Sequence, residues 1–240
     1  MRITLPEAVT PFVLKARKSS EPFVTGEGAH RRIRERFLGP APYALPERLR
    51  GVRVERGFPE PLIWPVYDVS PADAAARPAG PVPVVMYVHG GGWVNEMASQ
   101  HWSLIARITR ETGQWVIVPV HPLLPSGRAR AVRDGVVALV HAELDAGHEV
   151  WLAGDSSGGQ IILSAALRLR DEGIAVSATT LLSLAVDLTW DTPQIPAVEP
   201  LDPWPGRPGA HCWPRRVRAK TTSATPLSAR CSATSPASAR

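Results

Sequence analysis

Two glycine-rich segments, each directly after a run of apolar residues, constrain the fold of this chain more than any other feature. HGGGW (89–93) follows the apolar run VPVVMYV (82–88), and GDSSGG (154–159) follows VWLA (150–153). A continuous apolar run is typical of a strand that is covered on both faces. Helix-like segments separate these strands, so we expect an α/β fold with a mostly parallel sheet and helices on both faces. In such a sheet, the carboxyl ends of the strands carry the functional residues.

Strand-like and helix-like segments alternate through the middle of the chain. The expected strands are 52–56, 62–69, 82–88, 115–120, 150–153 and 178–186, and the expected helices are about 28–37, 97–111, 129–144 and 159–172. Apolar residues recur at helical spacing in the helices, and Gly113 and Gly173 follow two of them as stop signals. Turn residues separate the first two strands, so we expect an antiparallel pair at an edge of the sheet, where Pro65 is tolerated. Residues 70–81 predict a loop.

The charge distribution argues against a nucleic-acid partner. Residues 1–205 carry 20 Lys and Arg against 22 Asp and Glu, a net of −2, whereas residues 206–240 carry 7 Lys and Arg and no acid, a net of +7. The basic character therefore belongs to the tail. No apolar run reaches the roughly 18 residues that span a membrane, and we expect no membrane insertion. Cys212 and Cys231 both lie in the tail, so the body has no cysteine, and we expect a cytoplasmic protein.

The segment Gly154-Asp155-Ser156-Ser157-Gly158 satisfies G-x-S-x-G between a strand and a helix. A serine on such a turn has strained backbone dihedral angles and presents its hydroxyl above the sheet, next to the positive end of a helix. We therefore predict Ser156 as the nucleophile, with the backbone amide of Ser157 facing the oxyanion that forms on attack. D-S-G-G also occurs at the nucleophile of chymotrypsin-like proteases, which would select Ser157. Those proteases are all-β, and the alternation of strands and helices argues against that interpretation.

The HGGGW segment predicts the other part of the same anion site. Three consecutive glycines after a buried strand let backbone amides turn toward a ligand without hindrance from a Cβ atom. Because this segment occurs together with the elbow at Ser156, we predict an oxyanion hole formed by the backbone amides of Gly91, Gly92 and Ser157. The supporting residues of the two motifs are His89, Gly90, Gly154, Asp155 and Gly158.

With these motifs, residues 60–204 resemble the hormone-sensitive-lipase-like branch of the α/β-hydrolases, bacterial esterases that carry HGGG and GDS[AS]GG. LSLAVDLTW (182–190) is similar to the S-x-x-x-D-x-T segment of the family. The resemblance implies the α/β-hydrolase fold and hydrolysis of carboxylic esters without a cofactor, and we expect no metal. It also makes residues 1–50 similar to part of a cap over the active site. PVHPLLP (119–125) departs from the D-Y-R-L-A-P-like segment of many members, and we expect His121 to pack rather than to catalyse.

The same fold implies an acid and then a histidine downstream of the nucleophile. Only 84 residues follow Ser156, and residues 206–240 contain nine Ser and Thr, four Pro and no acid, a composition that cannot bury a core. We therefore predict a truncation or a frame shift near residue 205, a disordered tail, and a sheet that is incomplete at its C-terminal end and exposed at residues 178–186. The downstream acids are Asp171, Glu172, Asp187, Asp191, Glu199 and Asp202, and the downstream histidine is His211. We expect none of them to complete a triad.

The sequence thus predicts a partial α/β-hydrolase core at 51–205, between the cap-like segment 1–50 and the tail 206–240. The expected reaction is hydrolysis of a small-molecule ester through an acyl-enzyme on Ser156. Because the triad acid and histidine are missing from the predicted core, we expect impaired activity. A formamidase-like amide hydrolase would use the same elbow. A catalytically inactive remnant, or a binding protein, would keep Ser156 by descent alone.

Overall fold

The computed structural model describes residues 25–40, 43, 45, 49–74, 80–184, 186 and 192–201. The chain divides into two units, one of Gly39–Val186 and one of Met1–Leu38 with Asp187–Arg240. In the second unit, the described elements are the helix α3 (Gly26–Leu38), the short helix α7 (Ile195–Val198) and the 3-10 turn η2 (Glu199–Leu201). The predicted helix at 28–37 is α3, so this prediction is confirmed.

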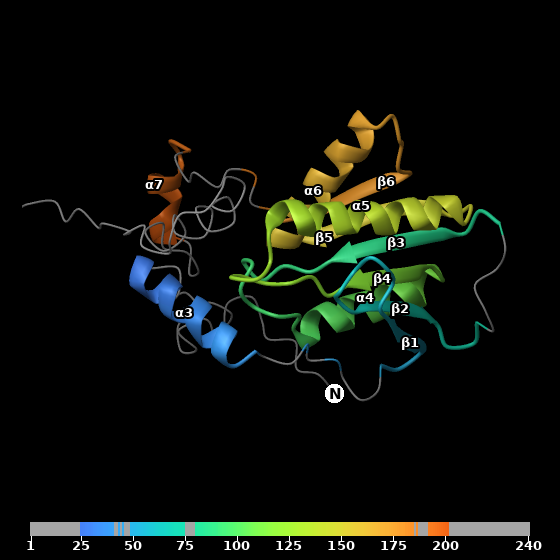
Figure 1. Cartoon of the computed structure of the whole chain (residues 1–240), viewed down its shortest axis with the longest axis horizontal. Coiled ribbons are helices and arrows are strands. Elements are labelled where there is room, and N and C mark those ends of the chain that lie inside the picture. Colours follow the sequence, from blue (N-terminus) through green and yellow to red (C-terminus); the bar gives the residue numbers. More distant parts are fainter. Residues whose placement is uncertain are drawn as a thin grey trace, which may run out of the picture. The chain divides into compact units, whose positions relative to one another are not determined.

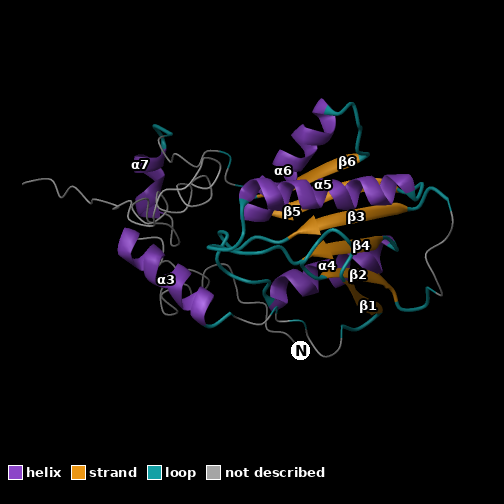
Figure 2. Cartoon of the chain, viewed as in Figure 1, coloured by secondary structure: helices purple, strands orange, loops and turns teal. Residues whose placement is uncertain are grey.

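The first unit is built on a six-stranded mixed sheet, drawn in orange in Figure 2. Its strands are β1 (Val52–Gly57), β2 (Val66–Pro71), β3 (Pro83–Val88), β4 (Trp115–Pro119), β5 (Glu149–Asp155) and β6 (Ala178–Leu182). Their spatial order is β1-β2-β4-β3-β5-β6, and β3 to β6 run parallel. β1 pairs antiparallel with β2, and β2 pairs antiparallel with β4. The predicted α/β architecture and the antiparallel edge pair are confirmed.

Three helices pack on this sheet (Figure 1). They are α4 (Ser99–Thr112), α5 (Ala129–Asp145) and α6 (Ser156–Asp171). α4 covers the part of the sheet that contains β1, β2 and β4, while α5 and α6 lie together on the opposite face over β3, β5 and β6. Helices therefore cover both faces of the sheet, as the alternating pattern predicts.

The core under α4 contains the apolar stripe that helical spacing predicts. Trp102, Ile105, Ala106 and Thr109 are the buried residues of this helix. The indole of Trp102 packs edge-to-face on the Tyr67 ring of β2, with ring centroids 5.2 Å apart, and its Nε1 donates a hydrogen bond of 2.7 Å to the Tyr43 carbonyl oxygen. Gly113 ends the helix with φ 70°, which is the left-handed conformation expected of a glycine stop signal.

Three predicted boundaries differ by three or more residues from those of the structure, and two of these differences have a local reason. β2 begins at Val66 rather than at residue 62, because Pro65 has no N–H to donate and contributes only its carbonyl, which accepts a bond from Val120 N–H at 3.0 Å. β6 ends at Leu182 rather than at residue 186, since Ser183 has φ 48° and turns the chain out of the extended conformation. α6 begins at Ser156, three residues before the predicted start.

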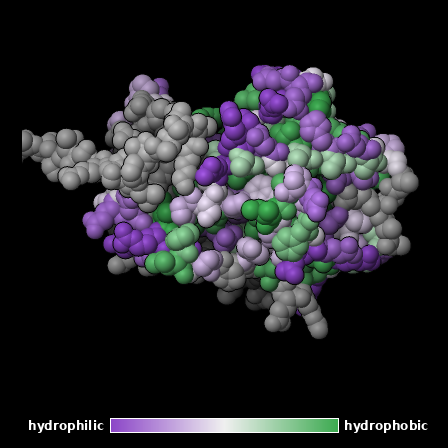
Figure 3. All heavy atoms as spheres, viewed as in Figure 1, coloured by the Kyte–Doolittle hydropathy of each residue, from purple (hydrophilic) through white to green (hydrophobic). Residues whose placement is uncertain are grey.

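The surface of the described part is of mixed character. On the face seen in Figure 3, hydrophilic and hydrophobic residues alternate over α5 and α6. β6 lies at one edge of the sheet, where Leu182 is 41% exposed. In the parts of the chain that the structure describes, no helix is both long and apolar enough to cross a membrane.

Candidate active site

The strand-to-helix turn of the GDSSGG segment is sharp. β5 ends at Asp155 and α6 begins at Ser156, whose φ of 49° lies in the left-handed region. Only glycine fits beside this turn: a Cβ atom at Gly158 would lie 2.1 Å from the Val88 carbonyl oxygen, and one at Gly154 would lie 2.9 Å from the same oxygen. The turn therefore packs directly against the end of β3. Ser156 has the strained backbone that G-x-S-x-G predicts.

The glycine loop after β3 also uses left-handed conformations. φ is 134° at Gly91 and 62° at Gly92, and the next residue, Trp93, has φ 65°. The backbone and side-chain amides of Asn95 donate to the Gly91 carbonyl oxygen at 2.9 and 3.2 Å. Trp93 Nε1 donates to Gln160 Oε1 of α6 at 3.0 Å. These bonds fix the course of the loop, so its backbone amides have defined directions.

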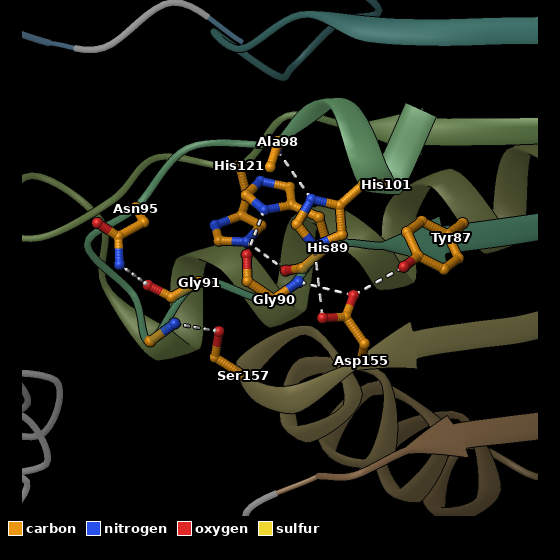
Figure 4. A network of polar contacts seen from close by, with 11 residues as sticks. Tyr87, His89, Gly90, Gly91, Asn95, Ala98, His101, His121, Asp155 and Ser157 are labelled. Carbon is orange, nitrogen blue, oxygen red and sulfur yellow. Dashed lines mark hydrogen bonds and ion pairs between the residues drawn. The ribbon is translucent and has the colours of Figure 1, made fainter. Parts of the chain in front are cut away.

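Two hydrogen bonds join the glycine loop to the elbow, as Figure 4 shows. The Gly90 N–H donates to Asp155 Oδ1 at 2.9 Å, and the Gly92 N–H donates to Ser157 Oγ at 3.0 Å. Contact between the segments is so close that a Cβ atom at Gly90 would lie 3.0 Å from the Ser156 Cβ. The structure thus brings together both predicted motifs, which lie 65 residues apart in the chain.

Asp155 is the polar centre of this junction. Besides Gly90, its Oδ1 accepts a bond of 2.7 Å from the Tyr87 hydroxyl, and its Oδ2 lies 3.5 Å from His101 Nε2. Because His101 Nδ1 accepts a bond from the Ala98 N–H at 2.9 Å, the ring proton sits on Nε2 and faces the carboxylate.

The electrostatics of the junction favour a charged Asp155. Burial alone would raise the pKa of its carboxyl group, but hydrogen bonds from His101, Tyr87 and the Gly90 amide outweigh burial and hold that pKa below its usual range. Burial, together with the neighbouring carboxylate, raises the pKa of Tyr87. Tyr87 therefore stays protonated and donates to an ionised Asp155 across the neutral pH range.

Two further histidines pack behind the glycine loop. The rings of His89 and His121 are buried and stacked, with centroids 4.6 Å apart and planes inclined by 12°. His89 Nδ1 donates to the Gly90 carbonyl oxygen at 2.6 Å. Burial lowers the pKa of both rings, and for His89 the neighbouring His121 lowers it further. Both rings are therefore neutral, and His121 occupies a packing position, as we expect from the sequence.

Four residues of the site were not predicted from the sequence: Tyr87 and His101, which hold Asp155, and Asn95 and Gln160, which hold the glycine loop. The one usable signal was a tyrosine at the end of an otherwise apolar strand, since a buried phenol needs a hydrogen-bond partner. His101 gave no comparable signal, because a histidine in the first turn of a helix is common on a solvated face.

The described residues contain no second half of a catalytic triad. Two downstream acids have surface partners: Asp171 pairs with Arg170 at 2.7 Å, and Glu172 pairs with Arg168 at 2.6 Å. Asp187, Asp191, Asp202 and His211, and the side chain of Glu199, lie outside the described residues. Within the described ranges, no cluster of three or more His, Cys, Asp or Glu side chains could hold a metal ion.

Comparisons with known proteins identify the family of the chain. The model of the alpha/beta hydrolase fold family matches residues 85–226, more than half of the chain, and the chain belongs to this family. The family predicted from the two motifs is therefore confirmed. The match continues past residue 205, after which the sequence predicts the start of the tail.

Individual relatives include catalysts and a receptor. A triacylglycerol lipase of Mycobacterium tuberculosis is 31% identical over 66% of this chain and 36% of the lipase. The gibberellin receptor GID1 of Oryza sativa is 34% identical over 45% of this chain and 34% of the receptor. A solved esterase of the bacterial hormone-sensitive lipase family is 22% identical with a TM-score of 0.68, covering 92% of this chain and 71% of that chain. The chain spans less than half the length of the curated relatives it matches.

Proposed function

We propose that this chain is a carboxylic ester hydrolase that acts on small-molecule esters through an acyl-enzyme on Ser156. The observation that carries the proposal is the packing of the glycine loop on a strained serine: Ser156 has φ 49°, and a Cβ atom at Gly90 would lie 3.0 Å from its Cβ. A lipase and an esterase among the similar proteins support the same reaction class. The absence of cysteine from residues 1–205 supports a cytoplasmic location.

In the proposed reaction, Ser156 Oγ attacks the ester carbonyl carbon, and negative charge develops on the carbonyl oxygen. Backbone N–H groups of Gly91, Gly92 and Ser157 would receive this oxyanion. Ser157 lies in the first turn of α6, where backbone N–H groups have no acceptor within the helix and the helix dipole favours negative charge. The tetrahedral species then expels the alcohol, and water hydrolyses the acyl-enzyme.

The Ser156 proton has no acceptor among the three histidines that lie at or behind the glycine loop, His89, His101 and His121. His89 and His121 are buried behind the loop and bonded to backbone carbonyls, and His101 Nε2 points its proton at Asp155. We therefore expect Ser156 to be acylated slowly unless the undescribed C-terminal residues supply a base.

The proposal is tested with p-nitrophenyl acetate and a fluorophosphonate on the whole chain, beside a Ser156→Ala variant. A matched control is Ser103→Ala, which removes a hydroxyl bonded to the Ser99 carbonyl oxygen in α4; Ser103 belongs to neither the glycine loop nor the elbow. Hydrolysis and labelling that persist in Ser103→Ala and vanish in Ser156→Ala support an ester hydrolase. If both reactions are equally present in Ser156→Ala, the assignment of Ser156 is wrong.

A binding protein is the second candidate, because one similar protein is a gibberellin receptor. It predicts neither hydrolysis nor labelling in the wild-type chain. An amide hydrolase is distinguished by turnover of an aryl formamide in preference to the acetate ester.

A further inference from the structure

The hydroxyl of Ser157 accepts a hydrogen bond from the Gly92 N–H, the donor that an oxyanion would use. The Gly92 N–H donates to Ser157 Oγ at 3.0 Å (Figure 4). Ser157 is buried, with 6% of the residue exposed. Gly92 and Ser157 both belong to the proposed oxyanion hole, one through its amide on the loop and the other through its amide on α6. Ser157 thus contributes its backbone N–H to the proposed oxyanion hole, while its hydroxyl accepts a hydrogen bond from a second donor of the hole, the Gly92 N–H.

We infer that in the ligand-free state the Ser157 hydroxyl takes the place of the oxyanion on the Gly92 N–H, and that rotation of this side chain releases the donor during catalysis. The inference rests on the proposed function, since an oxyanion forms only if Ser156 attacks a carbonyl. On this inference Ser157 is a positioning residue, whose side chain determines whether the Gly92 N–H is free to bind the oxyanion.

The side chain, rather than the loop, is the part that can move. Asn95 holds the loop at the Gly91 carbonyl, and Trp93 holds it to Gln160 of α6. The Ser157 backbone is part of α6, whereas its hydroxyl is positioned by the single χ1 torsion, whose energy minima are staggered rotamers. Rotation about one bond therefore frees the Gly92 amide while every backbone donor keeps its position.

Exchange of the acceptor favours the reacting state. A neutral hydroxyl oxygen accepts a weaker hydrogen bond than a charged oxyanion does. The Gly92 N–H would therefore donate to the oxyanion once charge develops, after its hydrogen bond to the Ser157 hydroxyl has broken. Breaking that bond costs free energy in the wild-type chain and slows acylation of Ser156. A variant without the hydroxyl has no such bond to break and should be acylated faster.

The test compares Ser157→Ala with wild type and with Ser103→Ala, which loses a part-buried serine hydroxyl in α4. We expect Ser157→Ala to react with a fluorophosphonate roughly three- to tenfold faster, which corresponds to about 0.7–1.4 kcal/mol. Ser103→Ala should react at the wild-type rate. A slower Ser157→Ala would mean that the hydroxyl donates to the oxyanion, and an unchanged rate would mean that it does not compete for Gly92; either result overturns the inference.

A spectroscopic readout separates this inference from the proposed function. In ¹H–¹⁵N spectra, we expect the Gly92 amide proton to shift upfield and to exchange faster with solvent in Ser157→Ala, and to be unchanged in Ser103→Ala. An unmoved Gly92 signal overturns the pairing. If the wild-type chain is not labelled at Ser156, the proposed function and the release step both fall, while a moved Gly92 signal still upholds the resting contact.

Discussion

Replacing Asp155 by asparagine keeps the size of the side chain and removes the charge on which the junction between loop and elbow depends. The carboxylate accepts two short bonds, from the Tyr87 hydroxyl at 2.7 Å and from the Gly90 N–H at 2.9 Å. Its third neighbour, His101, presents a donor at 3.5 Å. An asparagine that keeps its amide oxygen toward Tyr87 and Gly90 must turn its NH₂ group toward the Nε2 proton of His101. Two hydrogen-bond donors then face each other, and no hydrogen bond forms between them.

The expected loss follows from these contacts. Hydrogen bonds to charged groups contribute about 1.5–3 kcal/mol, and bonds between neutral groups about 0.5–1.5 kcal/mol. Two bonds that each weaken by about 1 kcal/mol lower the free energy of unfolding by about 2 kcal/mol at pH 7. The Asp155 side chain is only 26% exposed, so solvent screening removes little of this effect.

The loss depends on pH in a defined direction. The pKa of Asp155 is lower in the folded protein than in the unfolded chain, so its charged form stabilises the fold. This contribution is complete above the unfolded pKa of about 3.9 and disappears as pH falls through the folded pKa. Asparagine does not titrate, so the difference between wild type and Asp155→Asn should shrink below about pH 4.

Urea unfolding followed by tryptophan fluorescence at pH 7, 5 and 3.5 measures this difference. Asp134→Asn is the control, because Asp134 is 52% exposed and accepts hydrogen bonds from Arg133 on the surface of α5. We expect this control to change stability by less than about 0.5 kcal/mol. The reasoning about the charged junction would be refuted if Asp155→Asn lowered the free energy of unfolding at pH 7 by no more than the control does. It would also be refuted if the decrease in the free energy of unfolding were the same at every pH.

Three further substitutions test other parts of the structure. Gly90→Ala places a Cβ atom 2.3 Å from Asp155 Oδ2 and should reduce fluorophosphonate labelling at least about tenfold; labelling at the wild-type rate would show that loop and elbow do not pack as described. Trp102→Ala should lower stability by about 3–5 kcal/mol in urea unfolding, because this indole is fully buried; a loss below about 1 kcal/mol would contradict the core under α4. Gly113→Ala should cost about 1–2 kcal/mol through its φ of 70° alone, since no atom lies within 4 Å of a Cβ atom there, and an unchanged melting temperature would count against that conformation.

The sequence predicted the architecture well because buried strands and amphipathic helices have distinct periods. The stripe of α4 and the stop at Gly113 appeared where helical spacing placed them. The wrong end of β6 depends on a single backbone conformation, φ 48° at Ser183, for which the residue type gives no warning. The wrong start of β2 was foreseeable, because Pro65 has no N–H to donate.

The candidate site was predictable only in its motifs. Spacing and glycine content indicated that the loop and the elbow belong together, because both follow the carboxyl ends of parallel strands, and β3 and β5 are neighbours in the sheet. The groups that join them were not predictable. Tyr87 and His101 reach Asp155 across 68 and 54 residues of chain, and such pairings depend on packing that no local pattern encodes. The contact between Gly92 and the Ser157 hydroxyl is of the same kind.

The most direct test of Ser156 as nucleophile is to locate a fluorophosphonate adduct within the chain. Trypsin releases residues 134–168 as one peptide, which contains Ser156, Ser157 and Ser164. Fragment masses distinguish these three positions, because phosphonylation joins phosphorus to one serine oxygen and expels fluoride. We expect the adduct on Ser156, present in Ser157→Ala and absent in Ser156→Ala. An adduct on Ser157, or no adduct on this peptide, would contradict the account.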